Sequence, residues 1–273
     1  IGYEWGRHRQ RCPVFIAIAS GKGGTGKTTV SVYLAATLGG DVMLLDCDVD
    51  EPNCHLFLDG TPVKEETVTM PIPQVDEALC DVCGECGEFC EFHAIVSFGT
   101  TPLVFPEMCH GCGGCATVCP RNAISEIDER VGSVEITRAE NIILVQGRLD
   151  VGVPTAPSII RAVKTHLEAG KPAILDAPSG TTCPVISTLR GADYDALVTE
   201  PTPFGLHDLK LAVEMVRKLA IPFGVVVNRA GIGDDRVHLY CREESIPVLL
   251  DIPDDRRIAD EYSKGELIVE SLP

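Results

Sequence analysis

Two arrangements of residues in this chain are suited to chemistry: a glycine-rich loop with two lysines, and two regular groups of cysteines. The loop, GKGGTGKT at residues 21–28, fits the pattern G-x-x-x-x-G-K-[ST]. Glycines let successive backbone N–H groups face phosphate oxygens, Lys27 would reach the β- and γ-phosphates, and the Thr28 hydroxyl would bind Mg²⁺. The loop therefore predicts a nucleotide site, with contacts at Gly23, Gly24, Thr25, Gly26, Lys27, Thr28 and Thr29.

Short apolar segments place this loop between a strand and a helix. VFIAIA (14–19) is rich in strand formers, TTVSVYLAATL (28–38) predicts a helix, and VMLLD (42–46) predicts a second buried strand. This order of strand, loop, helix and strand implies a parallel sheet.

Carboxylates follow two of the predicted strands. Asp46 and Asp48 end the second strand, and Asp176 lies at the end of AILDAPSG (173–180). The carboxyl ends of parallel strands meet at one edge of a sheet, where a phosphate loop needs acids to hold the metal and orient water. Asp176 is therefore predicted to support Mg²⁺ together with Thr28, with Asp46 and Asp48 at the same edge.

The chain contains 13 cysteines, and eight of them fall between Cys80 and Cys119 in two runs spaced C-x₂-C-x₂-C-x₃-C. The segments CDVCGECGEFCEFHAI (80–95) and CHGCGGCATVCPRNAI (109–124) superimpose with all four cysteines in register, which indicates an internal duplication. Bacterial two-cluster ferredoxins have this spacing, and in them the fourth cysteine of each run binds the other cluster. We therefore predict one [4Fe–4S] cluster (cluster 1) on Cys80, Cys83, Cys86 and Cys119, and another (cluster 2) on Cys109, Cys112, Cys115 and Cys90.

Structural zinc is the alternative interpretation of these cysteines, because C-x₂-C pairs also build zinc sites. Two complete runs in duplicate favour iron–sulfur clusters, with zinc as an adventitious substitute in protein handled in air. Glu91 stands where the ferredoxin pattern has proline, which affects the local turn but not the ligands. Since four thiolates per cluster are already supplied, His93 and His110 are predicted not to be ligands.

The composition changes in the middle of the chain. The α/β pattern breaks near TMPIPQ (69–74), and Glu77 to Glu126 contains seven acidic residues against one basic residue. Alternating strand and helix patterns return further along the chain. We therefore predict an α/β P-loop NTPase domain with a mostly parallel sheet flanked by helices, formed by residues 1–75 and 127–273. Residues 76–126 are predicted to be an inserted small α+β domain like a bacterial ferredoxin.

The loop KGGTGKTT, with Lys22 directly before the paired glycines, resembles the deviant Walker A motif of the MinD/ParA family, which includes the nitrogenase iron protein. The resemblance extends to DCD (46–48), DAPSG (176–180) and VVVNRAG (225–231), and it covers nearly all of the α/β portion. In that family two subunits sandwich two ATP molecules face to face.

The resemblance implies roles for individual residues. Lys22 would reach across to the phosphates of the partner subunit, Asp48 would orient or deprotonate the attacking water, Asp176 would hold Mg²⁺ through water, and Asn228 would recognise adenine. A second cation at the γ-phosphate stabilises charge that develops during phosphoryl transfer. Hydrolysis would then depend on a dimer, formed with a second copy of the chain or with a related ATPase.

Two cysteines of the α/β portion lie near the predicted nucleotide site. Cys183 follows Asp176 by seven residues, a spacing similar to that of a cluster cysteine in the nitrogenase iron protein. The second cysteine of such a site has no clear counterpart here, so we expect Cys183 to be buried and structural. Cys47, between Asp46 and Asp48, is also expected to be a packing residue.

Charge and hydropathy restrict the partners. The formal net charge of −17 disfavours nucleic acid. No apolar run reaches the roughly 18–20 residues of a bilayer span, and the first residues do not resemble a signal peptide. The C-terminal GELIVESLP lacks the basic charge and the length of an amphipathic membrane helix. We therefore expect a cytoplasmic protein without a stable membrane anchor.

Three functions fit these patterns. The favoured one is a Mg²⁺-dependent ATP hydrolase that binds ATP and ADP and couples hydrolysis to electron transfer through two [4Fe–4S] clusters, with a redox or iron–sulfur acceptor protein as partner. The second is an iron–sulfur cluster carrier or scaffold ATPase. The third is a positioning ATPase of the MinD/ParA kind in which the cysteines act as a redox sensor, and the C-terminus weakens this hypothesis.

Overall fold

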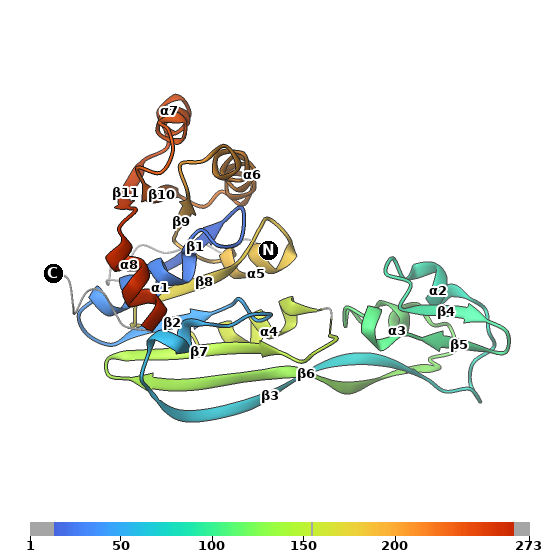
Figure 1. Ribbon diagram of the computed structural model, residues 1–273. Coiled ribbons are helices and arrows are strands. Elements are labelled where there is room, and N and C mark those ends of the chain that lie inside the picture. The colour runs from blue at the N-terminus through green and yellow to red at the C-terminus, as the bar shows by residue number, and fades with distance from the viewer. Residues whose placement is uncertain (1–13, 154, 265–273) are drawn as a thin grey trace, which may run out of the picture.

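The computed structural model describes residues 14–153 and 155–264, and in that part of the chain a nine-stranded sheet runs through the molecule (Figure 1). In spatial order its strands are β11 (Val248–Pro253), β10 (Phe223–Ala230), β9 (Tyr194–Thr199), β1 (Phe15–Ser20), β8 (Ala173–Ser179), β2 (Val42–Asp46), β7 (Ile142–Leu149), β6 (Ile124–Ala139) and β3 (Thr61–Val75). Neighbouring strands from β11 to β7 pair in parallel, whereas β6 is antiparallel to both β7 and β3. The predicted mostly parallel sheet is confirmed.

Helices cover the two faces of this sheet. They are α1 (Lys27–Thr37), α4 (Ala156–Lys164), α5 (Cys183–Leu189), α6 (Pro203–Leu219), α7 (Arg236–Glu243) and α8 (Arg256–Lys264). Successive strand residues point to opposite faces, so Ala17 and Ala19 of β1 share a buried cluster with α4, α5 and α6, while Ile18 shares another with α1. No described helix has the length and apolar character needed to cross a bilayer.

β3 and β6 form a long ribbon at the edge of the sheet (Figure 1). The sequence patterns do not indicate β3, because Pro62, Pro71 and Pro73 lie within it. An edge strand tolerates proline, since the missing N–H is not needed for pairing on the open side. The stretch TMPIPQ, expected to interrupt the α/β pattern, therefore lies inside a strand that pairs with β6.

The ribbon leads from the sheet to residues 76–126, here called the cysteine module (Figure 1). Its elements are α2 (Glu85–Phe89), β4 (Ile95–Phe98), β5 (Thr101–Val104), the 3₁₀ turn η2 (Pro106–Met108) and α3 (Gly114–Val118), with β4 and β5 forming a hairpin. A small buried cluster of Cys86, Ile95 and Ile124 lies apart from the two large clusters that flank the sheet. That the module is an independent domain with these bounds stays a prediction.

One buried carboxyl of the sheet makes the stability of the fold dependent on pH. Asp195 in β9 is fully buried, and among the described residues neither of its side-chain oxygens has a hydrogen-bond partner. Burial raises the pKa of Asp195 to about 8 from its ordinary value of 3.8. Between about pH 4 and about pH 8, Asp195 is therefore protonated in the folded chain and ionised in the unfolded chain. The free energy of unfolding falls as pH rises through this range.

We expect Asp195→Asn to raise the free energy of unfolding at pH 8 by a few kcal/mol and to have a smaller effect near pH 5, because it removes the ionisation. Denaturant unfolding of both proteins at the two pH values measures the difference. Asp195→Leu, which carries no polar side-chain atom, should show the same trend with pH. A difference between wild type and variant that does not change with pH would contradict this expectation.

Candidate functional site

The predicted phosphate loop connects β1 to α1, which begins at Lys27. Gly24 and Gly26 have left-handed backbone conformations, with φ of 77° and 93°, which glycine adopts without steric cost. A β-carbon at Gly26 would also collide with the Asn228 side chain, whose Nδ2 donates to the Thr25 carbonyl at 2.8 Å. Local backbone geometry and the close approach of Asn228 therefore explain why glycine is required at the start of the helix.

Thr28 and Asp176, the predicted magnesium pair, lie together. The Thr28 hydroxyl donates to Asp176 Oδ2 at 2.7 Å, and the Ser31 hydroxyl donates to Asp176 Oδ1 at the same distance. Thr28 and Ser31 lie on α1, and Asp176 lies on β8, so the helix after the loop and the neighbouring strand meet at this carboxylate. Hydroxyl and carboxylate oxygens are suitable Mg²⁺ ligands.

The two acids after β2 differ in their surroundings. Asp46 is fully buried, and its oxygens accept hydrogen bonds from the backbone N–H groups of Asp48, Asn53 and Cys54 at 3.0–3.1 Å. Its carboxylate thus fixes the path of the chain after the strand. Asp48 is only partly buried, so of the two acids it is the one whose side chain can turn toward a substrate.

The charges of this site are unbalanced without a metal. Burial lowers the pKa of Lys27, and the nearby Asp176 and Asp48 oppose that shift. Burial also raises the pKa of Asp48 to about 6; Lys27 opposes this rise and Asp176 adds to it. Burial, together with repulsion from the Asp176 carboxylate, raises the pKa of Asp46 as well. Three carboxyl groups around one lysine carry an excess of negative charge that a divalent cation would compensate.

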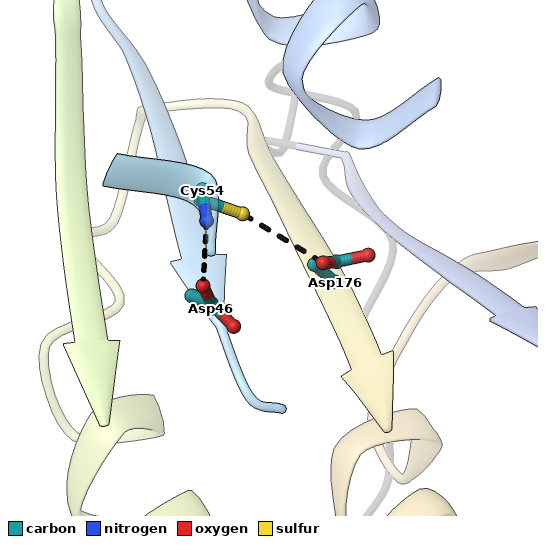
Figure 2. A group of neighbouring side chains, drawn as sticks. All are labelled: Asp46, Cys54 and Asp176. Atoms are coloured by element: carbon teal, nitrogen blue, oxygen red, sulfur yellow. Dashed lines mark hydrogen bonds between the residues drawn. The ribbon is translucent and has the colours of Figure 1, made fainter. Parts of the chain in front are cut away.

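Cys54 completes a buried group with Asp46 and Asp176 that sequence reasoning missed (Figure 2). It begins a short 3₁₀ turn, η1 (Cys54–Phe57), and its Sγ lies 3.7 Å from Asp176 Oδ2. Burial raises the pKa of the Cys54 thiol, so it stays protonated and serves as a donor to the carboxylate. Mg²⁺ prefers oxygen ligands, so only the two carboxylates of this group fit the predicted metal. No sequence pattern in DEPNCHLF (50–57) marks the cysteine, because its position beside Asp176 depends on the turn.

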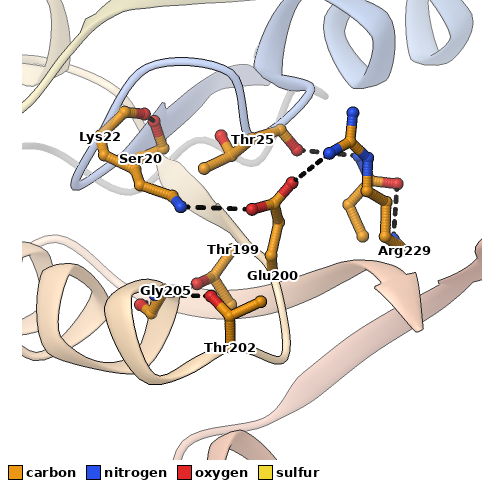
Figure 3. Close-up of polar contacts among 9 residues, drawn as sticks. Ser20, Lys22, Thr25, Thr199, Glu200, Thr202, Gly205 and Arg229 are labelled. Carbon is orange, nitrogen blue, oxygen red and sulfur yellow. Dashed lines mark hydrogen bonds and ion pairs between the residues drawn. The ribbon is translucent and has the colours of Figure 1, made fainter. Parts of the chain in front are cut away.

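Lys22 contacts a carboxylate of its own chain, at Glu200 (Figure 3). Its Nζ lies 3.2 Å from Glu200 Oε2, and Arg229 Nη1 donates to Glu200 Oε1 at 2.9 Å. Sequence reasoning missed Glu200, although it directly follows β9 at the same sheet edge as Asp48 and Asp176. The trans role of Lys22 and the adenine contact of Asn228 stay predictions.

The eight clustered cysteines line two cavities. One, of about 340 Å³, is bordered by Cys90, Cys109, Cys112 and Cys115. The other is much narrower, about 10 Å³, and is bordered by Cys80, Cys83, Cys86 and Cys119. Each cavity thus combines three cysteines of one run with the fourth cysteine of the other. These are the sets predicted for cluster 2 and cluster 1, and the narrower cavity must widen to take a cluster.

The internal duplication is also visible in the backbone of the cysteine module. Left-handed residues recur 29 positions apart, as the pairs Val82 and Gly111, Gly84 and Gly113, and His93 and Asn122. The N–H groups of Ala94 and Ala123 donate to Cys90 Sγ and Cys119 Sγ at 3.4 and 3.3 Å, also at this offset. Such N–H···S bonds stabilise thiolates that bind iron–sulfur clusters.

The sulfurs of each set lie farther apart than the ligands of a single zinc ion. Tetrahedral zinc with Zn–S bonds of about 2.3 Å holds its sulfurs about 3.8 Å apart. We consider groups of at least three Asp, Glu, His or Cys residues whose ligand atoms all lie within 4.8 Å of one another. Among the described residues there is one such group, formed by Asp46, Cys54 and Asp176. No three cysteines of either set are therefore that close, whereas the corners of an iron–sulfur cube separate its thiolates more widely than a single ion does.

Cys183 is not buried, so the prediction of a buried structural residue is wrong. It is exposed at the first position of α5, whose buried face is formed by Val185, Thr188 and Leu189. The first residue of this short helix precedes that face and points to solvent. Cys47 is fully buried, as expected.

Comparison with known proteins agrees with the nucleotide-binding fold and its phosphate loop. Residues 16–268 match the profile of the CobQ/CobB/MinD/ParA nucleotide binding domain family. An uncharacterized protein of Methanocaldococcus jannaschii is 30% identical over 93% of this chain and 90% of its own. The iron-sulfur cluster carrier protein of Aquifex aeolicus is 25% identical over 94% of this chain and 62% of its own.

A solved structure of similar fold is the septum site-determining protein MinD of Pyrococcus horikoshii, complexed with Mg-ADP. It has a TM-score of 0.57 and 23% identity, and the match covers 96% of this chain and 89% of that one. The fold, the phosphate loop and the profile match agree with one another. The chain belongs to the CobQ/CobB/MinD/ParA family of nucleotide-binding domains.

Proposed function

We propose that this protein is a Mg²⁺-dependent ATP hydrolase whose ATP-dependent dimer couples hydrolysis to electron transfer through two [4Fe–4S] clusters. The observation that carries the proposal is the pair of cysteine-lined cavities, each bordered by a crossed set of four cysteines, on a ribbon continuous with the nucleotide-binding sheet. The cysteine module, residues 76–126, would be the electron-transfer domain of this enzyme.

In this proposal the nucleotide site works through residues of two subunits. The loop amides and Lys27 bind the phosphates, and Thr28 with Asp176 holds Mg²⁺. Asp48 orients the attacking water, and with its pKa near 6 its carboxylate is mostly ionised at neutral pH. Asn228 contacts the adenine, and Lys22 of one subunit meets the phosphates bound by the other.

The clusters, when bound, supply one-electron transfer. Cys109 of the cluster 2 set belongs to the same buried cluster as the centre of the nucleotide-binding sheet, whereas Cys86 of the cluster 1 set belongs to the small outer cluster. Cluster 2 would therefore be the inner site, close to the ATPase, and cluster 1 the outer site, close to a redox or iron–sulfur acceptor protein.

An iron–sulfur cluster carrier is the second candidate. It is supported by the similarity to the iron-sulfur cluster carrier protein of Aquifex aeolicus. The two functions differ in what leaves the protein: a carrier gives up iron and sulfide to an apo-acceptor, whereas an electron-transfer protein keeps its clusters. Incubating the loaded protein with an apo-acceptor and ATP, and then measuring the iron that each protein retains, separates them.

We expect anaerobically purified protein to contain about eight iron atoms per chain, four for each cluster. Metal analysis measures the content, and redox titration with and without ATP measures whether the nucleotide shifts the reduction potential. A shift supports electron transfer. Stoichiometric zinc without iron, after reconstitution with iron and sulfide, would sink both iron–sulfur functions.

A further inference from the structure

A single carboxylate joins two cations that come from different parts of the nucleotide site (Figure 3). Glu200 Oε2 lies 3.2 Å from Lys22 Nζ in the phosphate loop. Glu200 Oε1 accepts from Arg229 Nη1 at 2.9 Å, and Arg229 follows the predicted adenine contact Asn228. The Glu200 side chain is only 9% exposed, so its charge depends on these partners for compensation.

The backbone around Glu200 is held firmly. Glu200 directly follows β9, which pairs with β1, the strand that leads into the phosphate loop. The Glu200 carbonyl accepts from the Thr202 N–H at 2.8 Å, and Thr202 caps α6 by accepting from the Gly205 N–H at 3.0 Å. A β-carbon at Gly205 would collide with the Glu200 carbonyl. The carboxylate is therefore placed beside the loop by the sheet and by the start of α6.

The two partners of Glu200 are unequal in what else they can do. The backbone N–H of Arg229 donates to Asn228 Oδ1 at 3.0 Å, so Arg229 lies beside the predicted adenine contact. Lys22 lies on the loop, and its ammonium is the group predicted to reach the phosphates of a partner subunit. When Lys22 moves away, Arg229 still pairs with the Glu200 carboxylate. The buried negative charge is therefore not left without a partner. A carboxylate and a phosphate thus compete for one ammonium.

We propose that Glu200 is a positioning residue for Lys22: it holds the ammonium within its own subunit until the phosphates of ATP on a partner draw it across. This inference rests on the proposed ATP-dependent dimer. Arg229 links the same carboxylate to the segment that carries Asn228. The strength of the Lys22–Glu200 ion pair therefore also depends on the part of the site predicted to bind adenine. ADP, which lacks the γ-phosphate, competes less well for Lys22 than ATP does.

The variant Glu200→Gln tests this inference, because glutamine keeps the size and one acceptor oxygen and removes the charge. We expect its dimer with a non-hydrolysable ATP analogue to dissociate at about tenfold lower concentration than the wild-type dimer. ATP hydrolysis at low protein concentration should rise accordingly, and nucleotide affinity of the monomer should stay near the wild-type value. Sedimentation in ATP analogue, ADP and no nucleotide, using the full chain with its metals, measures the dimer.

Arg229→Gln is the matched variant with the opposite expectation. It leaves Glu200 paired with Lys22 and without Arg229. The Lys22–Glu200 ion pair should therefore become stronger, and the ATP-dependent dimer should become weaker. If Glu200 had only a structural role, both substitutions would change the dissociation constant of the dimer in the same direction. If Glu200→Gln does not fold, Arg229→Gln still tests the inference, because an unchanged or tighter dimer overturns it.

The failure of this inference can be told apart from the failure of the proposed function. If Glu200→Gln dimerises like the wild type while Lys22→Ala loses ATP hydrolysis, Glu200 does not hold Lys22 but the dimeric ATPase stands. If Lys22→Ala hydrolyses ATP normally, the proposed trans role fails and the inference fails with it.

Discussion

Lys22→Ala is expected to lower the rate of ATP hydrolysis by about 10³-fold while changing ATP affinity little, because a cation supplied in trans acts on charge that develops in the transition state. Lys27→Ala is the matched control on the same loop. Lys27 is 6% exposed and lies within the subunit's own site, so its loss should abolish both binding and hydrolysis. Equilibrium binding of ATP and steady-state hydrolysis measure the two quantities. Loss of ATP binding in Lys22→Ala would argue against the trans role.

Mixing two inactive variants tests the trans arrangement directly. In a dimer of one Lys22→Ala subunit with one Asp48→Asn subunit, the site on the first subunit keeps its own Asp48 and receives Lys22 from the second. One of the two sites is then complete. Equal mixing should restore about a quarter of the wild-type rate, since half of the dimers are mixed and each has one working site. If Lys22 acts within its own subunit, mixing restores nothing.

The nucleotide loop could be predicted from sequence because its information is local: a strand, a glycine-rich loop and a helix follow one another within 25 residues. Asp176 and Asp48 could be placed because the carboxyl ends of parallel strands share one edge. Glu200 ends a strand at that edge too, but no local feature shows that its carboxylate meets Lys22. That contact depends on the pairing of β9 with β1 and on the close approach of Gly205.

Other differences have equally physical causes. β3 was not predicted because it contains three prolines, which have low strand propensity. Strand propensity does not show that a strand lies at a sheet edge, where proline is tolerated. Cys183 was expected to be buried on composition alone, since free cysteine is usually buried, but a residue at the first position of a short helix need not face the core. Cys54 carries no pattern at all, and only the turn after β2 brings it to Asp176.

The cysteine module packs closely against the nucleotide-binding domain at Met70 in β3. Met70 is 4% exposed, and its Sδ accepts from the hydroxyls of Thr155 and Ser158 at the start of α4, at 3.6 and 3.7 Å. Its Cγ lies 2.6 Å from the position that a β-carbon would take on Gly111, so only glycine fits there. Gly111 lies between Cys109 and Cys112, and its N–H donates to Cys109 Sγ at 3.4 Å.

The same helix, α4, meets the residue after Asp48 and the helix that follows the Asp176 strand. A β-carbon on Gly147 would touch Val49, Ile159 and Val163 together, which places the residue after Asp48 against the body of α4. At the end of α4, Lys164 Nζ donates to three carbonyls at the end of α5, which follows the Asp176 strand. One helix therefore touches the residue after Asp48, the helix that follows the Asp176 strand and, through Met70, the loop that carries two predicted cluster 2 ligands. This gives the proposed coupling a short, well-packed route.

The strongest test of the cysteine module concerns which cysteines share a cluster. Because the fourth cysteine of each run is predicted to bind the other cluster, Cys86 and Cys119 belong together although they lie in different runs. Cys86→Ala with Cys119→Ala should therefore disable one cluster and leave about four iron atoms per chain. Cys86→Ala with Cys90→Ala removes one ligand from each cluster and should leave almost none. Iron analysis of anaerobically purified variants measures both.

The two double variants give opposite results if each run holds its own cluster, since Cys86 and Cys90 would then share a site. In that case the pair in one run would keep about four iron atoms and the crossed pair would keep almost none. Cys183→Ala, at an exposed cysteine outside the module, is the control and should keep all the iron. Circular dichroism of each variant shows whether the nucleotide-binding fold is retained. The crossed arrangement requires the two runs to face each other, which is the arrangement of cysteines around the two cavities.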